Sequence, residues 1–244
     1  MTPQRRSLFY PLLALAISAT AFLGFAFTYL GPLMTGSYAP VSWAVHAHGI
    51  IFLTWCALLP VQASLPTAGA IPVHKALGIA SPVLVLAMTF TGLLTISARV
   101  QAALLGEGSD FWKAFSIPIT AGLVLFLGFY IAALLNRSRP DWHKRFMIVA
   151  AATVIAAGMW RVIVAAFGFA DWAMPAAVGA TKLFIVAGMI HDLITRRSIH
   201  PAYWVGLITT LVVEFGSFAI VGSAAEGPVA STIALFAVAF GWLY

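Results

Sequence analysis

Residues 41–78 read VSWAVHAHGIIFLTWCALLPVQASLPTAGAIPVHKALG, and this stretch decides the fold. Residues 41–65 contain no Lys, Arg, Asp or Glu, and about 20 apolar residues are enough for a helix to cross the hydrocarbon core of a bilayer. The segment therefore predicts a transmembrane helix, and the Pro- and Gly-containing turn at 66–72 leads into the next one. His46 and His48 are then expected inside the membrane, where titratable side chains are costly and are candidates for function.

The composition extends this prediction to the whole chain. Of its 244 residues 62% are hydrophobic and only 8% are charged, and the mean hydropathy is +1.00, whereas soluble domains are about one quarter charged. We predict an all-α, polytopic transmembrane helical bundle of seven to eight spans that forms a single domain over residues 1–244. The spans are expected at 7–32, 41–65, 76–97, 115–135, 146–167, 175–194 and 202–222, and 229–244 is just short for an eighth.

The basic residues predict the orientation of the bundle. Lys and Arg concentrate in cytoplasmic loops, and a cytoplasmic N-terminus accounts for nine of the thirteen basic residues: Arg5, Arg6, Lys75, Arg137, Arg139, Lys144, Arg145, Arg196 and Arg197. The net charge of +6 is thereby explained by topology, and no nucleic-acid partner is expected. We expect a multi-pass protein of the cell inner (plasma) membrane, in contact with the lipid bilayer.

Four polar side chains are expected together in the outer half of the membrane: His48, Arg161, Lys182 and Glu214. Because an unpaired charge in hydrocarbon is expensive, Glu214 should face Arg161 or Lys182 across the bundle. His46 and His48 lie about 200° apart around one helix, so only one can face such a site, and His48 is the inward candidate. A polar stripe at helical spacing accompanies Glu214: Tyr203, Thr210 and Ser217. These residues predict either a polar cavity or hydrogen bonds that hold helices together.

Three histidines are expected at the inner boundary, each from a different segment: His74, His143 and His191. Imidazoles that converge at the end of a bundle can bind a haem iron axially or, together with Asp192, bind a transition-metal ion. Asp141 and Asp192 could orient such rings through the second ring nitrogen. The alternative is that His74 and His143, each followed by Lys, lie in the lipid headgroup layer with their basic neighbours. No motif with strict metal-ligand spacing is present to decide between these interpretations.

A family resemblance is carried by three motifs. They are H-A-H-G followed by Trp55 and Gln62, V-H-K-A-L-G at 73–78, and D-W-H-K-R-F-M at 141–147. With them the chain resembles a widespread group of uncharacterised bacterial multi-spanning membrane proteins over most of its length. It is more distantly similar to small cytochrome b-type membrane proteins, which hold haem between helices through paired histidines. That resemblance implies at most one haem b, on the inner side, since the outer histidines come from one helix only.

Three classes of function remain open from the sequence. The first is a haem- or metal-binding protein of electron transfer, or a factor that assembles one, with His74, His143 and His191 as ligands. The second is an accessory or structural subunit of a larger membrane complex, which the Gly- and Ala-rich helices would suit. The third is a small transporter or lipid-binding protein that uses the outer polar layer. No residue pattern identifies a catalytic group.

Overall fold

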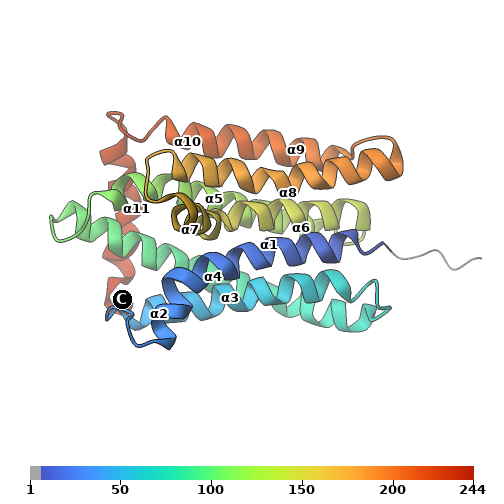
Figure 1. The fold of residues 1–244 in the computed structure, drawn as a ribbon, viewed down its shortest axis with the longest axis horizontal. Coiled ribbons are helices and arrows are strands. Elements are labelled where there is room, and N and C mark those ends of the chain that lie inside the picture. Colours follow the sequence, from blue (N-terminus) through green and yellow to red (C-terminus); the bar gives the residue numbers. More distant parts are fainter. Residues whose placement is uncertain (1–6) are drawn as a thin grey trace, which may run out of the picture.

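The computed structural model describes residues 7–244, and all regular structure in this range is helical, as predicted (Figure 1). The main helices are α1 (Phe9–Phe25), α3 (Trp43–Ser64), α4 (Ile71–Leu104), α5 (Phe111–Leu135), α6 (Pro140–Val154), α7 (Ala156–Phe167), α8 (Ala173–Arg196), α9 (Pro201–Thr210) and α11 (Glu226–Phe240). Short segments continue some of them: η1 (Ala26–Leu30) and α2 (Gly31–Met34) follow α1, η2 (Leu211–Phe215) and α10 (Gly216–Phe218) follow α9, and η3 (Gly241–Leu243) follows α11. Within the described range, seven helices are long and apolar enough to cross a membrane, and the bent pair α6 and α7 adds an eighth candidate.

Two spans differ most from the sequence prediction. Helix α4 has 34 residues, which at about 1.5 Å per residue gives about 51 Å, far more than the hydrocarbon core. The prediction of 76–97 was too short because Arg99 and Gln101 made the last turns look like a loop. Helix α6 begins at Pro140 rather than at 146, since Pro is well tolerated in the first turn of a helix.

The fifth span is broken near its middle. Helices α6 and α7 meet at an angle of 48°, and Ile155 between them has φ −88° and ψ 3°, outside the helical region. Three β-branched residues in a row, Thr153, Val154 and Ile155, weaken the helix there. The Thr153 hydroxyl also donates to the carbonyl of Ala150 at 2.7 Å, a local bond that bends helices. The span therefore consists of two half-helices.

Helix α11 lies across the other helices at one end of the bundle (Figure 1). Helix α11 begins shortly after α10, at this end of the bundle. Beyond the other terminus of α11, the carbonyl of Tyr244 accepts a hydrogen bond from Ser42, which lies just before α3. Both ends of α11 are thus at the same end of the bundle. Its inner face packs on α4 through Ala230 and Ala234, which contact Val100. The region of α11 is one of the seven segments of the described chain that are long and apolar enough to span a membrane, although the helix lies across one end of the bundle (Figure 1).

Glycines allow two helix pairs to approach closely. A Cβ on Gly24 of α1 would lie 2.2 Å from the carbonyl oxygen of Gly158 on α7, so the two backbones touch. A Cβ on Gly188 of α8 would lie 2.2 Å from the hydroxyl of Tyr203 on α9. Such small-residue contacts are the usual means by which membrane helices pack, since lipid provides no hydrophobic drive between them.

The end of the bundle opposite α11 contains the start of α1 and the connections at 65–70, 136–139 and 197–200 (Figure 1). His74 and His143 lie in the first turns of α4 and α6, at this same end. The positive charge of these connections predicts that this end lies in the cytoplasm. Arg5 and Arg6, which were counted in this prediction, lie outside the described residues.

Candidate functional site

His74 and His143 come together at the predicted inner end of the bundle. Their ring centroids are 6.2 Å apart and the ring planes are nearly perpendicular, at 87°. His143 Nδ1 donates a hydrogen bond to the backbone carbonyl of Ala133 at 2.8 Å, which leaves Nε2 of the neutral ring with a free lone pair. His74 Nδ1 lies 3.1 Å from the backbone carbonyl of Gln62 on α3. Two helices thus present imidazoles whose Nδ1 atoms are held by α5 and α3.

The Gln62 side chain also borders this pair. When its amide nitrogen faces the ring, it lies 2.8 Å from His74 Nδ1, and the amide oxygen then accepts from the backbone N–H of Gly78 at 3.0 Å. A neutral His74 ring forms only one of these bonds, because Nδ1 either donates to the Gln62 carbonyl or accepts from the Gln62 amide nitrogen. The tautomer that donates to the carbonyl is the one that leaves a lone pair on Nε2. Among residues 7–244, no hydrogen bond is formed to Nε2 of either His74 or His143.

His191 does not join the other two histidines in the arrangement that was predicted. Its ring stacks on Phe9 of α1, with centroids 3.9 Å apart and planes 11° apart, and meets the edge of Tyr10. Its Nδ1 atom is buried without a hydrogen-bond partner in the described part of the chain. Within residues 7–244, no group of three or more His, Cys, Asp or Glu side chains is placed to hold a metal ion. The inner histidines therefore form a pair plus one separate ring.

Asp192 is engaged by a buried cation that the sequence analysis had assigned to a cytoplasmic loop. Arg145, only 1% exposed, donates through Nε to Asp192 Oδ2 at 2.8 Å and forms an ion pair through Nη2 with Oδ1. Its Nη1 donates to the carbonyl of Asp141 at 2.7 Å and to the Asp141 carboxylate at 3.1 Å. Both aspartates considered as partners of the histidines thus bind Arg145, and this network joins α6 to α8. The spacing of Asp141 and Arg145, four residues apart at a helix start, was the signal available in the sequence.

His200 completes this network from the connection between α8 and α9. Its backbone N–H donates to Asp192 Oδ2 at 3.1 Å, and its Nδ1 accepts from the N–H of Ala202, which caps α9. Burial lowers the pKa of His200 below its usual value, and the nearby positive charges of Arg145 and Arg196 lower the pKa further. The lowered pKa favours the neutral ring, in which Nδ1 can accept the hydrogen bond from Ala202, and no pattern in the sequence had indicated His200.

The ion pair predicted for the outer layer is formed between Lys182 and Glu214. The two side chains come from α8 and η2 and are 4% and 1% exposed. The polar stripe on α9, η2 and α10 faces the interior as predicted, because Tyr203, Thr210 and Ser217 are all buried. Glu214 Oε1 has no hydrogen-bond partner among the described residues.

Arg161, the other candidate for Glu214, is used elsewhere. Its Nε donates to the hydroxyl of Thr28 at 2.9 Å and its Nη1 donates to the carbonyl of Ala157 at 2.9 Å. The guanidinium lies over the ring of Phe25, 4.5 Å from the centroid, and a cation over an aromatic face is stabilised. The alternative pairing with Glu214 is therefore wrong.

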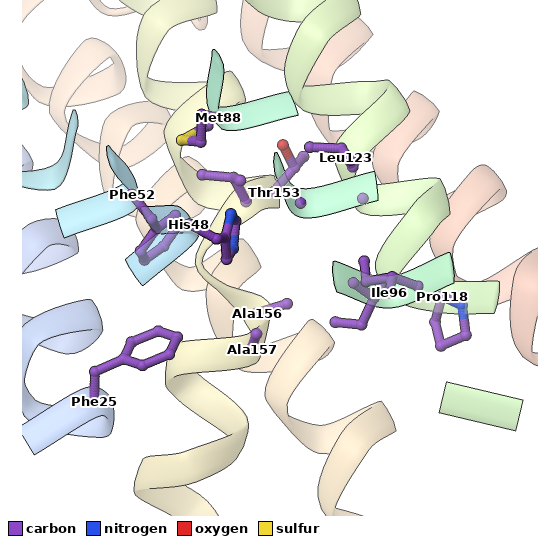
Figure 2. Close-up of a pocket in the computed structure, with 14 residues that line it drawn as sticks. Phe25, His48, Phe52, Met88, Ile96, Pro118, Leu123, Thr153, Ala156 and Ala157 are labelled. Atoms are coloured by element: carbon purple, nitrogen blue, oxygen red, sulfur yellow. The ribbon is translucent and has the colours of Figure 1, made fainter. Parts of the chain in front are cut away.

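His48 faces a cavity of about 80 Å³ in the centre of the bundle, whereas His46 turns outward and bonds the hydroxyl of Tyr29 at 3.0 Å. Figure 2 shows the His48 ring among side chains of several helices, including Phe25, Met88 and Thr153. His48 Nδ1 lies 3.1 Å from the hydroxyl of Thr91. The predicted inward orientation of His48 is confirmed.

One irregular segment of backbone, the break at Ile155, borders this cavity, and two π-helical turns contain the partners of Arg161 and Lys182. The π-helical turn η1 contains Thr28, the partner of Arg161, and the π-helical turn η2 contains Glu214. The break at Ile155 separates Thr153 and Ala156, which both line the cavity. Since π-turns and interrupted membrane helices frequently occur at functional sites, we regard this layer as a second candidate site.

The comparisons with known proteins provide no relative: no family model, no curated protein and no solved structure matched the chain. The chemistry of the two candidate sites is therefore argued from their own residues.

Proposed function

We propose that this integral membrane protein binds one transition-metal centre through His74 and His143 and serves in electron transfer or in the assembly of a redox protein. The centre would be the iron of one haem b or a single metal ion. The observation that carries the proposal is the orientation of the two rings: a backbone carbonyl lies at Nδ1 of each ring, and the tautomer that donates to this carbonyl has a free lone pair on Nε2. This is the arrangement of metal-ligating histidines in general, where a bond from the second nitrogen fixes the ring and increases its basicity.

The donor set fits both forms of the centre. A haem iron takes two axial ligands from the protein because the porphyrin nitrogens fill its other positions, and imidazoles from two helices are common axial ligands. A single ion could add water to the two nitrogens. When bound, a haem iron or a single iron or copper ion would supply reversible one-electron chemistry, whereas a zinc ion would not. The chain's own contribution is to hold both rings: Ala133 on α5 orients His143, and Gln62 on α3 orients His74.

The sequence had predicted His191 and Asp192 as further metal ligands, and the proposal leaves both of them out. Asp192 has both oxygens bonded to Arg145, so its use as a ligand would break a buried ion pair. His191 could join only if its ring left the face of Phe9. The pair and the three-histidine set thus make different predictions for a His191 variant.

The test is a metal and haem analysis of the full chain, purified in mild detergent. We expect a Soret band that shifts on reduction, or about one equivalent of iron, copper or zinc per chain by elemental analysis. His74→Ala and His143→Ala should each lose the signal while keeping their helical circular dichroism. His46→Ala is the matched control, since His46 bonds Tyr29 and lies in neither candidate ligand set.

The His191→Ala variant decides between the two ligand sets. Full retention of the signal supports the pair, and its loss restores the three-histidine set. If the wild-type chain has neither a Soret band nor bound iron, copper or zinc, the proposal is overturned, and the histidines become residues of the headgroup layer. A structural role as an accessory subunit of a larger membrane complex is then the remaining interpretation from the sequence analysis.

One observation favours a small transporter as a second candidate function. The fifth span is interrupted at Ile155 beside the cavity. In many transporters interrupted helices form the substrate site near the middle of the bilayer. Solute uptake into liposomes that contain the wild-type chain, compared with uptake into liposomes that contain the Glu214→Gln variant, would test this candidate function. Equal fluxes in wild-type and empty liposomes would exclude this candidate.

A further inference from the structure

A groove opens on the outside of the bundle between α1 and α3. Its volume is about 430 Å³, and Pro11, Leu12 and Leu15 of α1 form one of its walls. The other wall is formed by residues between 60 and 68, at the end of α3 and in the connection that follows. Leu12, Leu15 and Val61 are each about half exposed, so the groove is open to its surroundings. In a bilayer these surroundings are lipid chains.

The groove lies beside a direct contact between the two helices. Pro60 has no N–H, so the carbonyl of Cys56, one turn earlier in α3, has no donor within the helix. The Ser18 hydroxyl of α1 donates to this carbonyl at 2.7 Å and thereby holds α1 against α3. The groove extends from this contact toward the end of the bundle that contains the connection 65–70 (Figure 1). It therefore lies in the leaflet at that end, which is the inner leaflet in the predicted orientation.

The walls of the groove suit a hydrocarbon chain. Residues 60–68 cover about 12 Å at the helical rise of about 1.5 Å per residue, and one leaflet contributes about 15 Å of hydrocarbon. Of the eight residues that line the groove, Ser64 alone has a polar side chain, and its hydroxyl donates to the carbonyl of Pro60 at 2.7 Å. No side-chain donor is therefore left in the walls for a polar ligand.

The charges around this end of the groove are positive. Residues 1–106 contain no Asp or Glu, so α1, α3 and α4 have no acidic side chain. Arg5 and Arg6 come just before α1 in the sequence, and Lys75 lies near the start of α4. Lys75 is exposed and forms no ion pair in the described part of the chain. On α6, by contrast, Asp141 forms ion pairs with cations of α6 and α8.

We infer that this α1–α3 groove is a lipid-binding site, which holds one acyl chain of an anionic phospholipid and places its phosphate near Lys75 and the two arginines before α1. A phospholipid of this class provides both parts of the match, an apolar chain for the walls and a negative charge for the cations. Basic side chains at the cytoplasmic surface attract anionic lipids, each by about fivefold in affinity. A free phosphate would leave the groove empty, and a zwitterionic lipid would leave the positive charge uncompensated.

Native mass spectrometry of the full chain in mild detergent, after incubation with equal amounts of phosphatidylglycerol and phosphatidylcholine, tests the site. We expect the chain to retain one phosphatidylglycerol, in preference to phosphatidylcholine by at least about tenfold. Lys75→Gln should reduce this preference by about fivefold, because one basic side chain is removed. Lys113→Gln is the charge control, since Lys113 lies at the opposite end of the bundle and is paired with Asp110.

Ser64→Phe tests the groove itself, because the added ring fills the space of the acyl chain. This variant should lose the retained lipid while it keeps its helical circular dichroism. Thr54→Phe is the matched control, since Thr54 is exposed on the same helix and does not line the groove. Its hydroxyl donates to the backbone carbonyl four residues earlier at 2.7 Å, as that of Ser64 does. Both replacements thus remove one local hydrogen bond of the same kind, and only one of them fills the groove.

Equal retention of the two lipids by the wild-type chain would overturn the inference, and so would a Ser64→Phe variant that retains as much lipid as Thr54→Phe. A wild-type dimer without lipid that Ser64→Phe dissociates would assign the groove to a second copy of the chain and would also refute the lipid site. The metal proposal is tested separately, because His74→Ala and His143→Ala change no residue of the groove. Lipid retention should be unchanged in both of these variants, whether or not they lose a metal signal.

Discussion

Replacement of Lys182 by Met should destabilise the protein by leaving the carboxylate of Glu214 alone in the bundle. Both side chains are at most 4% exposed, so water cannot compensate the lost charge. Removing one member of a buried ion pair costs about 3–5 kcal/mol. We expect the lower end of this range, because the isolated Glu214 can take up a proton. No other side chain can replace Lys182, since Arg161 is already bound to Thr28 and to the Ala157 carbonyl.

A double-mutant cycle measures the pairing directly. Lys182→Met combined with Glu214→Met should recover most of the stability, to within about 1 kcal/mol of the wild type, because apolar residues can replace a buried pair at little cost. The assay is SDS-induced unfolding in mixed micelles, followed by tryptophan fluorescence. Arg161→Met with Glu214→Met is the control and should be additive within about 0.5 kcal/mol. If the Lys182 and Glu214 losses simply add, the two residues do not stabilise each other, and the central ion pair has no role in folding.

Three further predictions follow from other parts of the molecule. Asp192→Asn should cost about 3 kcal/mol in the same assay, because Arg145 is 1% exposed and would keep only its Asp141 contacts; a loss below about 0.5 kcal/mol would contradict the buried network. The pKa of His200 is lowered in the folded protein, so its contribution to stability is complete above the ordinary pKa of about 6.5 and is lost as the pH falls below it. His200→Asn, which retains a capping side chain, should therefore reduce the loss of stability as the pH falls below about 6.5. A reporter that is active only in the periplasm should be silent when fused after Arg139, and activity there would reverse the predicted orientation.

The residues that were placed correctly from the sequence are those whose position follows from the energetic cost of an unpaired charge in the membrane or from the helical period. A lone carboxylate in an apolar span needs a cation, and only Arg161 and Lys182 were available near the depth of Glu214, so its pairing could be narrowed to two candidates. Helical period alone placed Tyr203, Thr210 and Ser217 on the buried face of the same span. The same geometry distinguished His48 from His46, two residues away.

The misplaced residues depended on quantities that a sequence pattern does not contain. Rise per residue gives the depth of a side chain but not its direction around the bundle, so His191 was expected beside His74 and lies on Phe9 instead. The break at Ile155 has no Pro, and a run of β-branched residues also occurs in unbroken membrane helices. Arg145 was taken as a loop residue because the helix start was placed one residue after it.

The contact between Gly24 and Gly158 has a mechanical consequence. Neither glycine can accept a side chain without moving a backbone, since a Cβ on Gly158 would lie 3.0 Å from Cα of Ala21 in the same way. This close backbone contact joins α7, one half of the broken span, to α1, and we expect it to restrain the 48° bend. Phe25, beside Gly24, is part of the cavity wall, and so are Ala156 and Ala157 of α7. If α1 and α7 stay joined, a change in the volume around His48 is expected to come from α3, α4, α5 or α6, which form the rest of the wall.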